Sequence, residues 1–419
     1  MKLEQQTGNR PAIIRLVSIQ FLALLVVGLF TLLILIYRRH DSLNDLHLYY
    51  KSSLSLFRGQ VPYRDFPLEY PPLSLLPMVL PQLVTLGQPL SFRSYLSIFL
   101  LENALLSTLV MLILVQILRY LQLRQRTMWV LKIYVVFVAI SAPILAWRFD
   151  LFPALLTQLA LLSVLVGRPT LAGIWLGFGI TAKLYPIVLI PIFSIYYLAG
   201  RKYNALLRLL LASIGATGLI LLPFFLLARG TLFSFLRYHQ VRGLQVETIP
   251  AGVISLAHML GLTQARIDFN YGAFHLVSPL ADSVLKLQPF VFILAFLVIS
   301  VTCLSRFQDE QANSGAITIE SLVAYVFVAL LTFMVTSKVF SPQYIIWLLP
   351  FAPLLPRRQT ILMIAIFTLS ILLYPWGYRL LLNFHPAFVV LLNLRNILVV
   401  ALLLWLLVDR LPHRRKLSG

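Results

Sequence analysis

Uninterrupted apolar runs constrain this chain more than any other feature, and the first of them covers residues 13–36. A run of about 20 apolar residues crosses a bilayer as one helix. Hydrophobic residues make up 60% of the 419-residue chain and the mean hydropathy is +0.89, so a soluble domain is excluded. No ten-residue segments alternate as a transmembrane barrel requires. We therefore expect an all-α polytopic membrane protein without strands.

The first apolar run follows Lys2, Arg10 and Arg15. It is too long for a signal-peptide core and has no small-residue cleavage site, so we interpret it as a retained first helix. We find no repeat of fixed period, no linker and no room for a soluble domain. Residues 1–419 are expected to form a single membrane domain.

The formal charge of +20 is spread over loops and helix ends without a basic tail. This dispersal argues against a nucleic-acid partner and favours anionic lipid or a phosphate-bearing substrate. The single cysteine, Cys303, excludes an intrachain disulfide and a cysteine-based metal or redox site, and we interpret it as a small packing residue.

One polar stretch stands out between the apolar runs. Residues 41–72 contain four of the 14 acidic residues in a chain that is only 11% charged. Apolar residues at steps of three and four from Leu43 to Phe57 predict a helix lying in the membrane interface. Gly59 and Pro62 then predict a tight loop, and the double proline that ends at Pro72 opens another helix.

Basic clusters at the ends of apolar runs set the expected topology, because such clusters prefer the cytoplasm. We expect a bundle of about twelve transmembrane helices with both termini cytoplasmic. Interfacial helices are expected in a first outer loop, and a second outer loop follows later. The expected spans are 13–36, 92–118, 128–147, 151–166, two within 170–200, 205–228, 282–304, 318–336, 344–356, 361–373 and 387–408, with a polar loop at 306–316 and outer loops at 37–91 and 229–281.

All the unusual polar clusters fall on the outer side of this topology. A transporter needs functional groups near the midplane in paired broken helices, and no internal repeat supports that arrangement. An enzyme that acts at one membrane surface on a lipid-borne substrate needs a pocket of this one-sided kind. The pattern therefore favours a surface enzyme.

Several segments together also resemble the GT-C superfamily of integral-membrane glycosyltransferases, and glycosyltransferase family 87 in particular. They are DLHLYY (45–50), GQVPY (59–63), EYPPL (69–73), TAKLYP (181–186), YHQVRGLQVE (238–247) and SPQYIIWLLP (341–350). That family includes polyprenyl-phosphate-mannose-dependent mannosyltransferases. The resemblance implies a polyprenyl-phosphate sugar donor, inversion at the anomeric carbon, and an acidic residue of the first outer loop as general base. On this chain that residue is Asp45, with Asp41 as a nearby competitor.

The chemistry independently requires a base for the acceptor hydroxyl and cations for the departing phosphate. Asp45 suits the first role, although a carboxylate facing a helix dipole explains it equally. The candidate phosphate ligands are Arg242, Lys183 and Lys338, each of which could instead extend to the headgroups. Arg395 lies deep in the last span, where it needs a cavity, a backbone carbonyl or Asn393 as partner.

The remaining candidates are aromatic, acidic and amide side chains for the sugar or the acceptor. Interfacial aromatic residues, Trp147 included, are also common as membrane-belt residues. A lone histidine in a loop is commonly just solvated, and Asp150 is expected to pair with Arg148 rather than to act as a second carboxylate. No metal site and no cofactor besides the donor substrate are expected. The sugar and acceptor candidates are Tyr49, Tyr63, Glu69, Tyr70, His239, Gln245, Glu247, Gln343 and Tyr344.

The predicted function is an inverting hexosyltransferase that moves a sugar, with mannose suggested by the resemblance, onto a lipid or glycan acceptor. The predicted location is the outer face of a bacterial plasma membrane, with membrane lipids as partners. A lipid-linked glycan polymerase or ligase and a lipid or sugar transporter stay open as alternatives.

Overall fold

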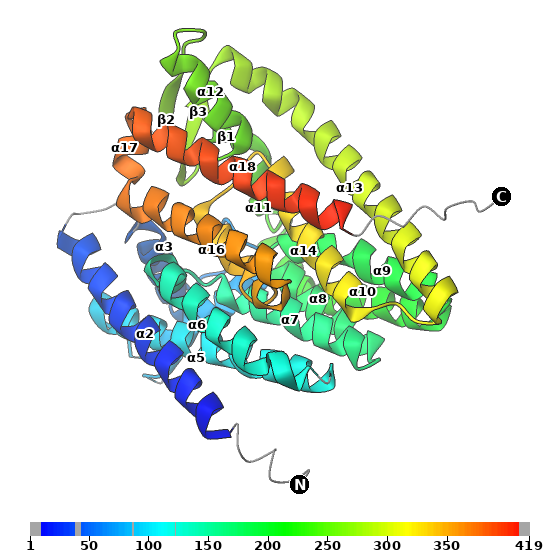
Figure 1. Ribbon diagram of the computed structural model, residues 1–419. Helices are drawn as coiled ribbons and strands as arrows, with labels where there is room; N and C mark the ends of the chain where they lie inside the picture. Colours follow the sequence, from blue (N-terminus) through cyan, green and yellow to red (C-terminus); the bar gives the residue numbers. More distant parts are fainter. Residues whose placement is uncertain (1–9, 38–42, 86–87, 122, 410–419) are drawn as a thin grey trace.

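The computed structural model describes residues 10–37, 43–85, 88–121 and 123–409, and it is a bundle of apolar helices with one small sheet (Figure 1). In the described part, eight helices are long and apolar enough to cross a membrane. The predicted class, an all-α polytopic membrane protein, is confirmed. The eight are α2 (Arg10–Tyr37), α5 (Phe92–Tyr120), α6 (Arg124–Leu145), α10 (Tyr203–Ala228), α13 (Pro279–Ser314), α14 (Ile319–Thr336), α16 (Arg357–Ile371) together with η5 (Leu372–Trp376), and α18 (Pro386–Val408).

Three further predicted spans are shorter helices: α7 (Leu151–Leu165), α8 (Pro169–Ala182) and α9 (Leu189–Ala199). The predicted count of twelve spans is therefore not reached by helix length alone. The predicted span 344–356 is not a continuous helix either. It consists of η3 (Pro342–Tyr344), α15 (Ile345–Leu348) and η4 (Ala352–Leu354), because prolines at 350, 353 and 356 remove the donors that a helix needs.

The polar stretch near the N-terminus forms the predicted helix α3 (Leu43–Phe57). Leu46, Tyr49 and Ser52 are buried, whereas Phe57 at the end of the predicted apolar face is exposed. Tyr50 donates a hydrogen bond to the Leu90 carbonyl. A loop then leads through η1 (Pro72–Ser74) into α4 (Leu75–Leu83), which is too short to span the membrane. The two short helices are present as expected, and their position in the membrane interface stays a prediction.

The predicted polar loop at 306–316 is wrong, because α13 continues to Ser314 before Gly315 ends it in the left-handed region. Arg306 and Glu310 form an i,i+4 ion pair at 2.7 Å that supports the polar end of the helix. Glu310 also accepts hydrogen bonds from Thr318 and Ser321 at the start of α14. The polar residues therefore stabilise a helix end and the following cap instead of forming a loop.

The segment 229–281 folds into α11 (Ser234–Val241), α12 (Ile249–Met259) and three strands. Helix α17 (Tyr378–Leu382) lies beside it. The strands are β1 (Leu244–Gln245), β2 (Arg266–Asn270) and β3 (Ala273–Val277), antiparallel in the order β1-β3-β2. The expectation of no strands is therefore wrong. Five-residue strands joined at Tyr271 and Gly272, both with positive φ, are too short for the ten-residue alternation of a membrane barrel.

Close packing of α8 against α10 depends on two glycines. A Cβ at Gly173 would lie 2.3 Å from the Leu209 carbonyl oxygen, and a Cβ at Gly177 would lie 2.7 Å from the Ser213 carbonyl oxygen. Small residues at such contacts let helix backbones approach within a membrane. This contact fixes the end of α8, where Lys183 follows.

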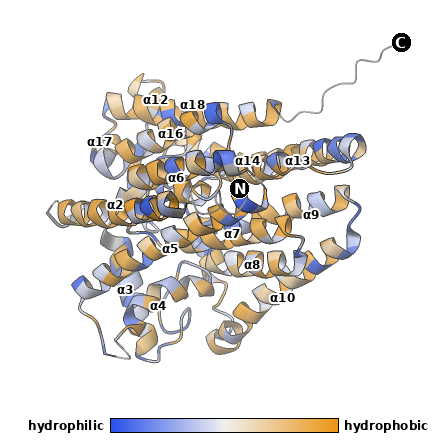
Figure 2. Cartoon of the chain, turned by 60° about the horizontal axis from the view of Figure 1, so that its bottom comes forward, coloured by the Kyte–Doolittle hydropathy of each residue, from blue (hydrophilic) through white to orange (hydrophobic). Residues whose placement is uncertain are grey.

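The ends of several helices, with the polar segments that connect them, lie at one end of the bundle. Helices α6, α8, α14 and α16 end there, and α7 and α18 begin there. The helix bodies are largely hydrophobic, while hydrophilic residues gather toward helix ends and connecting segments (Figure 2). Loops at this end can therefore build a polar site above an apolar bundle.

Candidate active site

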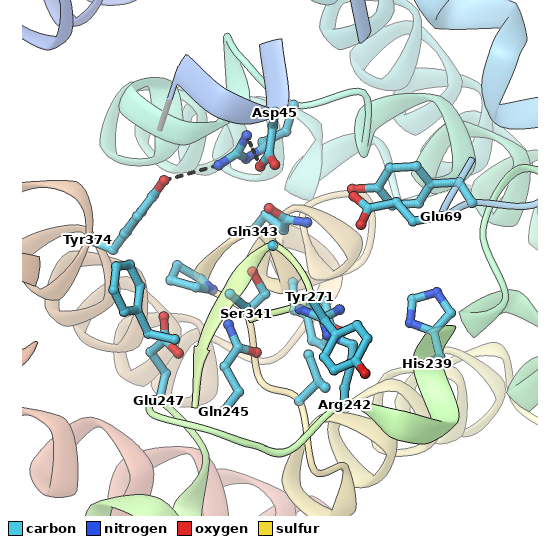
Figure 3. A pocket seen from close by; sticks show the side chains of 18 of the residues that line it. Asp45, Glu69, His239, Arg242, Gln245, Glu247, Tyr271, Ser341, Gln343 and Tyr374 are labelled. Carbon is cyan, nitrogen blue, oxygen red and sulfur yellow. Dashed lines mark hydrogen bonds and ion pairs between the residues drawn. The ribbon is translucent and has the colours of Figure 1, made fainter. Parts of the chain in front are cut away.

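A single cavity of about 230 Å³ brings together segments from along the whole chain (Figure 3). Its walls come from α3, the loop before η1, the turn between α6 and α7, the residue after α8, and the segments near 240, 271, 341 and 375. Its polar lining contains Asp45, Glu69, Arg148, Lys183, His239, Arg242, Gln245, Glu247, Ser341 and Gln343. Most residues predicted for base, phosphate or sugar contacts thus face one space.

Asp45 occupies the first turn of α3, and its side chain is 26% exposed. It forms an ion pair with Arg148, whose own side chain is only 7% exposed. Arg148 also donates a hydrogen bond of 3.0 Å from Nη2 to the Tyr374 hydroxyl. The carboxylate is therefore held in one direction and keeps an accessible edge on the cavity (Figure 3).

Lys183 does not extend to the lipid headgroups but pairs with a buried carboxylate. Its Nζ donates to Asp150 Oδ1 at 2.6 Å, and the Trp347 indole donates to the same oxygen at 2.6 Å. The expected Asp150–Arg148 pair is therefore wrong. Arg148 and Asp150, in the turn between α6 and α7, each pair with another element instead of with each other. Arg148 pairs with Asp45 at the start of α3, and Asp150 pairs with Lys183 at the end of α8.

Arg242 faces the cavity without an ion pair among the described residues. Its Nε is buried and has no acceptor, and its guanidinium lies 5.7 Å from the centre of the Tyr238 ring. A buried donor without an acceptor is costly, and an anion in the cavity would satisfy it. Arg242 is thus the cation in this wall most available for a ligand.

Gln245 and Glu247 lie on the side of the cavity away from Asp45 (Figure 3). The Gln245 Oε1 is buried without a donor. Burial raises the pKa of Glu247 to about 7, although the Tyr378 hydroxyl and the charges of Arg395 and Arg242 oppose this rise. This end can therefore accept and donate hydrogen bonds at neutral pH.

Glu69 and His239 form a third side of the cavity. Burial raises the pKa of Glu69, and a hydrogen bond with Tyr238 opposes the rise. Burial and the charges of Arg242 and Lys183 lower the pKa of His239 to about 4, so the imidazole is neutral at pH 7. A neutral imidazole can both donate and accept hydrogen bonds, so His239 can contact a ligand hydroxyl in the cavity.

Four predicted residues lie behind the cavity wall instead of on it. Lys338 donates to the Gln240 carbonyl at 2.7 Å, and Arg395 donates to the Glu247 carbonyl at 2.8 Å. Tyr63 donates to the Tyr70 carbonyl at 2.7 Å, and Tyr49 is fully buried. These contacts support the segments that carry lining residues.

The aromatic candidates Tyr70 and Tyr344 do line the cavity, and Tyr344 stacks on Trp347 with ring centres 3.7 Å apart. Trp147, in contrast, is buried and donates to the Gly28 carbonyl at 3.2 Å. Asp41, the competitor of Asp45, lies outside the described residues. Asn393 donates to the Gly252 carbonyl at 2.9 Å rather than serving Arg395.

The sequence reasoning missed part of the lining. Tyr374 and Tyr378 enter from the segment after α16, and Phe269, Tyr271 and Phe274 enter from the β2–β3 hairpin. The sequence YPWGY at 374–378, which combines a proline and a glycine with two tyrosines directly after a span, was the available signal. Among the described residues, no three His, Cys, Asp or Glu side chains gather as metal ligands do.

The fold and the cavity define a membrane-embedded enzyme whose polar site lies at one end of a helical bundle. The family model of glycosyltransferase family 87 matches residues 68–336, which is more than half of the chain. The chain therefore belongs to glycosyltransferase family 87 and is a glycosyltransferase. The matched segment contains Arg148, Lys183, Arg242 and Glu247 and begins after Asp45. A search of curated proteins finds no match to this chain.

Proposed function

We propose that this protein is an inverting hexosyltransferase that uses a polyprenyl-phosphate sugar as donor and a lipid or glycan hydroxyl as acceptor. One observation carries the proposal: an oriented carboxylate, Asp45, shares a single cavity with an arginine, Arg242, that has no ion pair among the described residues. A base and an unneutralised cation in one space are what displacement of a phosphate from a sugar requires.

In the proposed reaction, Asp45 takes the proton of the acceptor hydroxyl while the oxygen of that hydroxyl attacks the anomeric carbon of the donor sugar. The bond from that carbon to the phosphate oxygen breaks, and the electron pair leaves with the polyprenyl phosphate. Attack opposite the leaving group inverts the anomeric configuration. Arg242 and Lys183 stabilise the negative charge that returns to the phosphate, and the lipid tail stays among the apolar helices.

The polar groups on the side of Gln245 and Glu247 supply contacts for sugar hydroxyls. A hydroxyl both donates and accepts, so it can satisfy the free Gln245 oxygen and pair with Glu247 at the same time. Tyr70 and Tyr344 provide ring faces in the same wall. Mannose is the sugar that we propose first, because family resemblance points to it.

Charge placement supports an outer-face site in a bacterial plasma membrane. The helix ends opposite the cavity carry Arg119, Arg124, Arg168, Arg201, Lys202, Arg357 and Arg358. Basic residues beside helix ends prefer the cytoplasm, so the cavity would face outward. In a Cys303→Ala background, Gln264→Cys should react with a membrane-impermeant maleimide in intact cells, and Gln308→Cys should not. The reverse labelling would overturn this orientation.

The central experiment incubates membranes with a panel of labelled polyprenyl-phosphate sugars and follows transfer and product configuration. Asp45→Asn should bind the donor with unchanged affinity yet lose transfer by at least about 100-fold, since it can no longer take a proton. Asp282→Asn is the matched control, because Asp282 also lies in the first turn of a helix. Unimpaired transfer by Asp45→Asn, or an unchanged anomeric configuration in the product, would refute the proposal.

A further inference from the structure

The turn between α6 and α7 contains three consecutive residues, Arg148, Phe149 and Asp150, that are all buried. Its first residue contacts Asp45, and its last residue contacts Lys183. Asp45 and Lys183 are far apart in the sequence, yet both contact residues of this turn. The partners of the two groups, Arg148 and Asp150, are therefore only two positions apart in the sequence.

Neighbouring elements hold the turn itself in place. The Asn103 amide donates to the Ala146 carbonyl at 3.3 Å, and the Trp147 indole donates to the Gly28 carbonyl, so α5 and α2 both fix the residues just before the turn. Phe149 packs its ring against Tyr49 and Tyr70, with ring centres 5.5 and 5.0 Å apart. A turn fixed from three sides can impose a direction on whatever its ends bind.

At the first end, Arg148 divides its guanidinium between two partners. One nitrogen pairs with Asp45 and the other donates to the Tyr374 hydroxyl. Because the guanidinium is planar, fixing two of its nitrogens fixes the direction from which it meets the carboxylate. Asp45 sits on a surface helix, so this contact determines where its free oxygen points.

At the second end, Asp150 is fully buried and gathers two donors on one oxygen. Trp347, on α15, donates to this carboxylate. Among the described residues, Asp150 is the only carboxylate that forms an ion pair with Lys183. The Lys183 ammonium also lies 4.9 Å from the centre of the Phe149 ring and 5.5 Å from that of Trp347. The ammonium is thus fixed between a carboxylate and aromatic faces while it lines the cavity.

We propose that Arg148 and Asp150 are positioning residues, which set the separation between the proton acceptor Asp45 and the cation Lys183. The inference rests on the proposed function and adds a division of labour to it. Arg148 acts on the chemical step through Asp45, whereas Asp150 acts on donor binding through Lys183. Pre-set geometry of this kind avoids reorganisation during the reaction.

The test separates kcat from donor affinity in purified protein, with labelled polyprenyl-phosphate mannose as the probe. Arg148→Gln should lower kcat by at least about 100-fold and change the donor Kd less than about threefold, because the base is no longer oriented. Arg148→Lys keeps the charge and should recover part of kcat. Asp150→Asn still accepts from Trp347 but no longer fixes the Lys183 ammonium in position, so the donor Kd should rise about tenfold.

Three controls keep the outcomes distinct. Arg306→Gln breaks a comparable ion pair away from the cavity and should change neither parameter. If Asp150→Asn does not fold, Trp347→Phe removes the second donor to Asp150 without changing a charge and should raise the donor Kd by a smaller factor. Equal losses of kcat and affinity in the Arg148 and Asp150 variants would reduce the turn to a structural element and overturn the inference. Activity of Asp45→Asn would instead refute the proposed function.

Discussion

The Nζ of Lys183 lies 2.6 Å from Oδ1 of Asp150, and both groups are shielded from solvent. Removing one member of a buried pair leaves an uncompensated charge, which is more costly than removing both. Because Lys183 also lines the cavity, substitutions of this residue should change the stability of the helix bundle as well as ligand binding.

Lys183→Met should therefore destabilise the protein by about 3 kcal/mol. The double variant Lys183→Met/Asp150→Leu should recover much of this loss, since no buried charge remains. Thermal unfolding of the detergent-solubilised protein measures both effects. Arg64→Met is the control, because it breaks an exposed ion pair and should leave the unfolding temperature unchanged. A double variant less stable than Lys183→Met would contradict the argument.

Arg242→Gln should weaken donor binding by about tenfold or more, because a charge-assisted contact to the phosphate is lost. Arg242→Lys should bind with intermediate affinity, since a point charge replaces a planar fork. Titration with the labelled donor gives the Kd directly. The matched control is Arg237→Gln, which lies on α11 just before Arg242 and is exposed to solvent. Equal effects of the two Gln variants would show that Arg242 acts only through general surface charge.

Local periodicity was sufficient to predict the helices that the site depends on. The steps of three and four in residues 43–57 predicted the bounds of α3, although Phe57 at the end of the predicted apolar face is exposed. The turn at 148–150 was also predicted, since polar residues interrupt two apolar runs there. Both features are properties of neighbouring residues.

The pairing of the charged groups could not be predicted in the same way. Asp150 and Arg148 are neighbours in sequence, yet their partners are set by which helix ends converge in three dimensions. Tyr374 and the β2–β3 hairpin reach the cavity only through long-range packing. The sequence predicts a polar loop at 306–316 because Thr318, which stabilises the helix end through Glu310, lies beyond that segment.

The α8–α10 contact makes a stability prediction that involves no charge. Gly173→Ala should lower the unfolding temperature, because its Cβ would collide with the Leu209 carbonyl, which cannot rotate away. Gly215→Ala and Gly218→Ala on α10 are controls, since nothing lies within 4 Å of a Cβ at either position. The controls should be neutral or slightly stabilising, as alanine favours the helix. A neutral Gly173→Ala would show that the two helices separate readily.

The last prediction concerns pH and Glu247. Its pKa is raised from 4.5 to about 7, so between these values the folded protein binds a proton that the unfolded chain has released. Stability therefore falls as pH rises through this window, by up to about 3 kcal/mol. Glu247→Gln cannot lose that proton, so its stability relative to the wild type should be higher at pH 8 than at pH 5. Unfolding temperatures at both pH values measure the difference, with exposed Glu320→Gln as the control. A difference that is the same at both pH values would show that burial does not perturb this carboxyl.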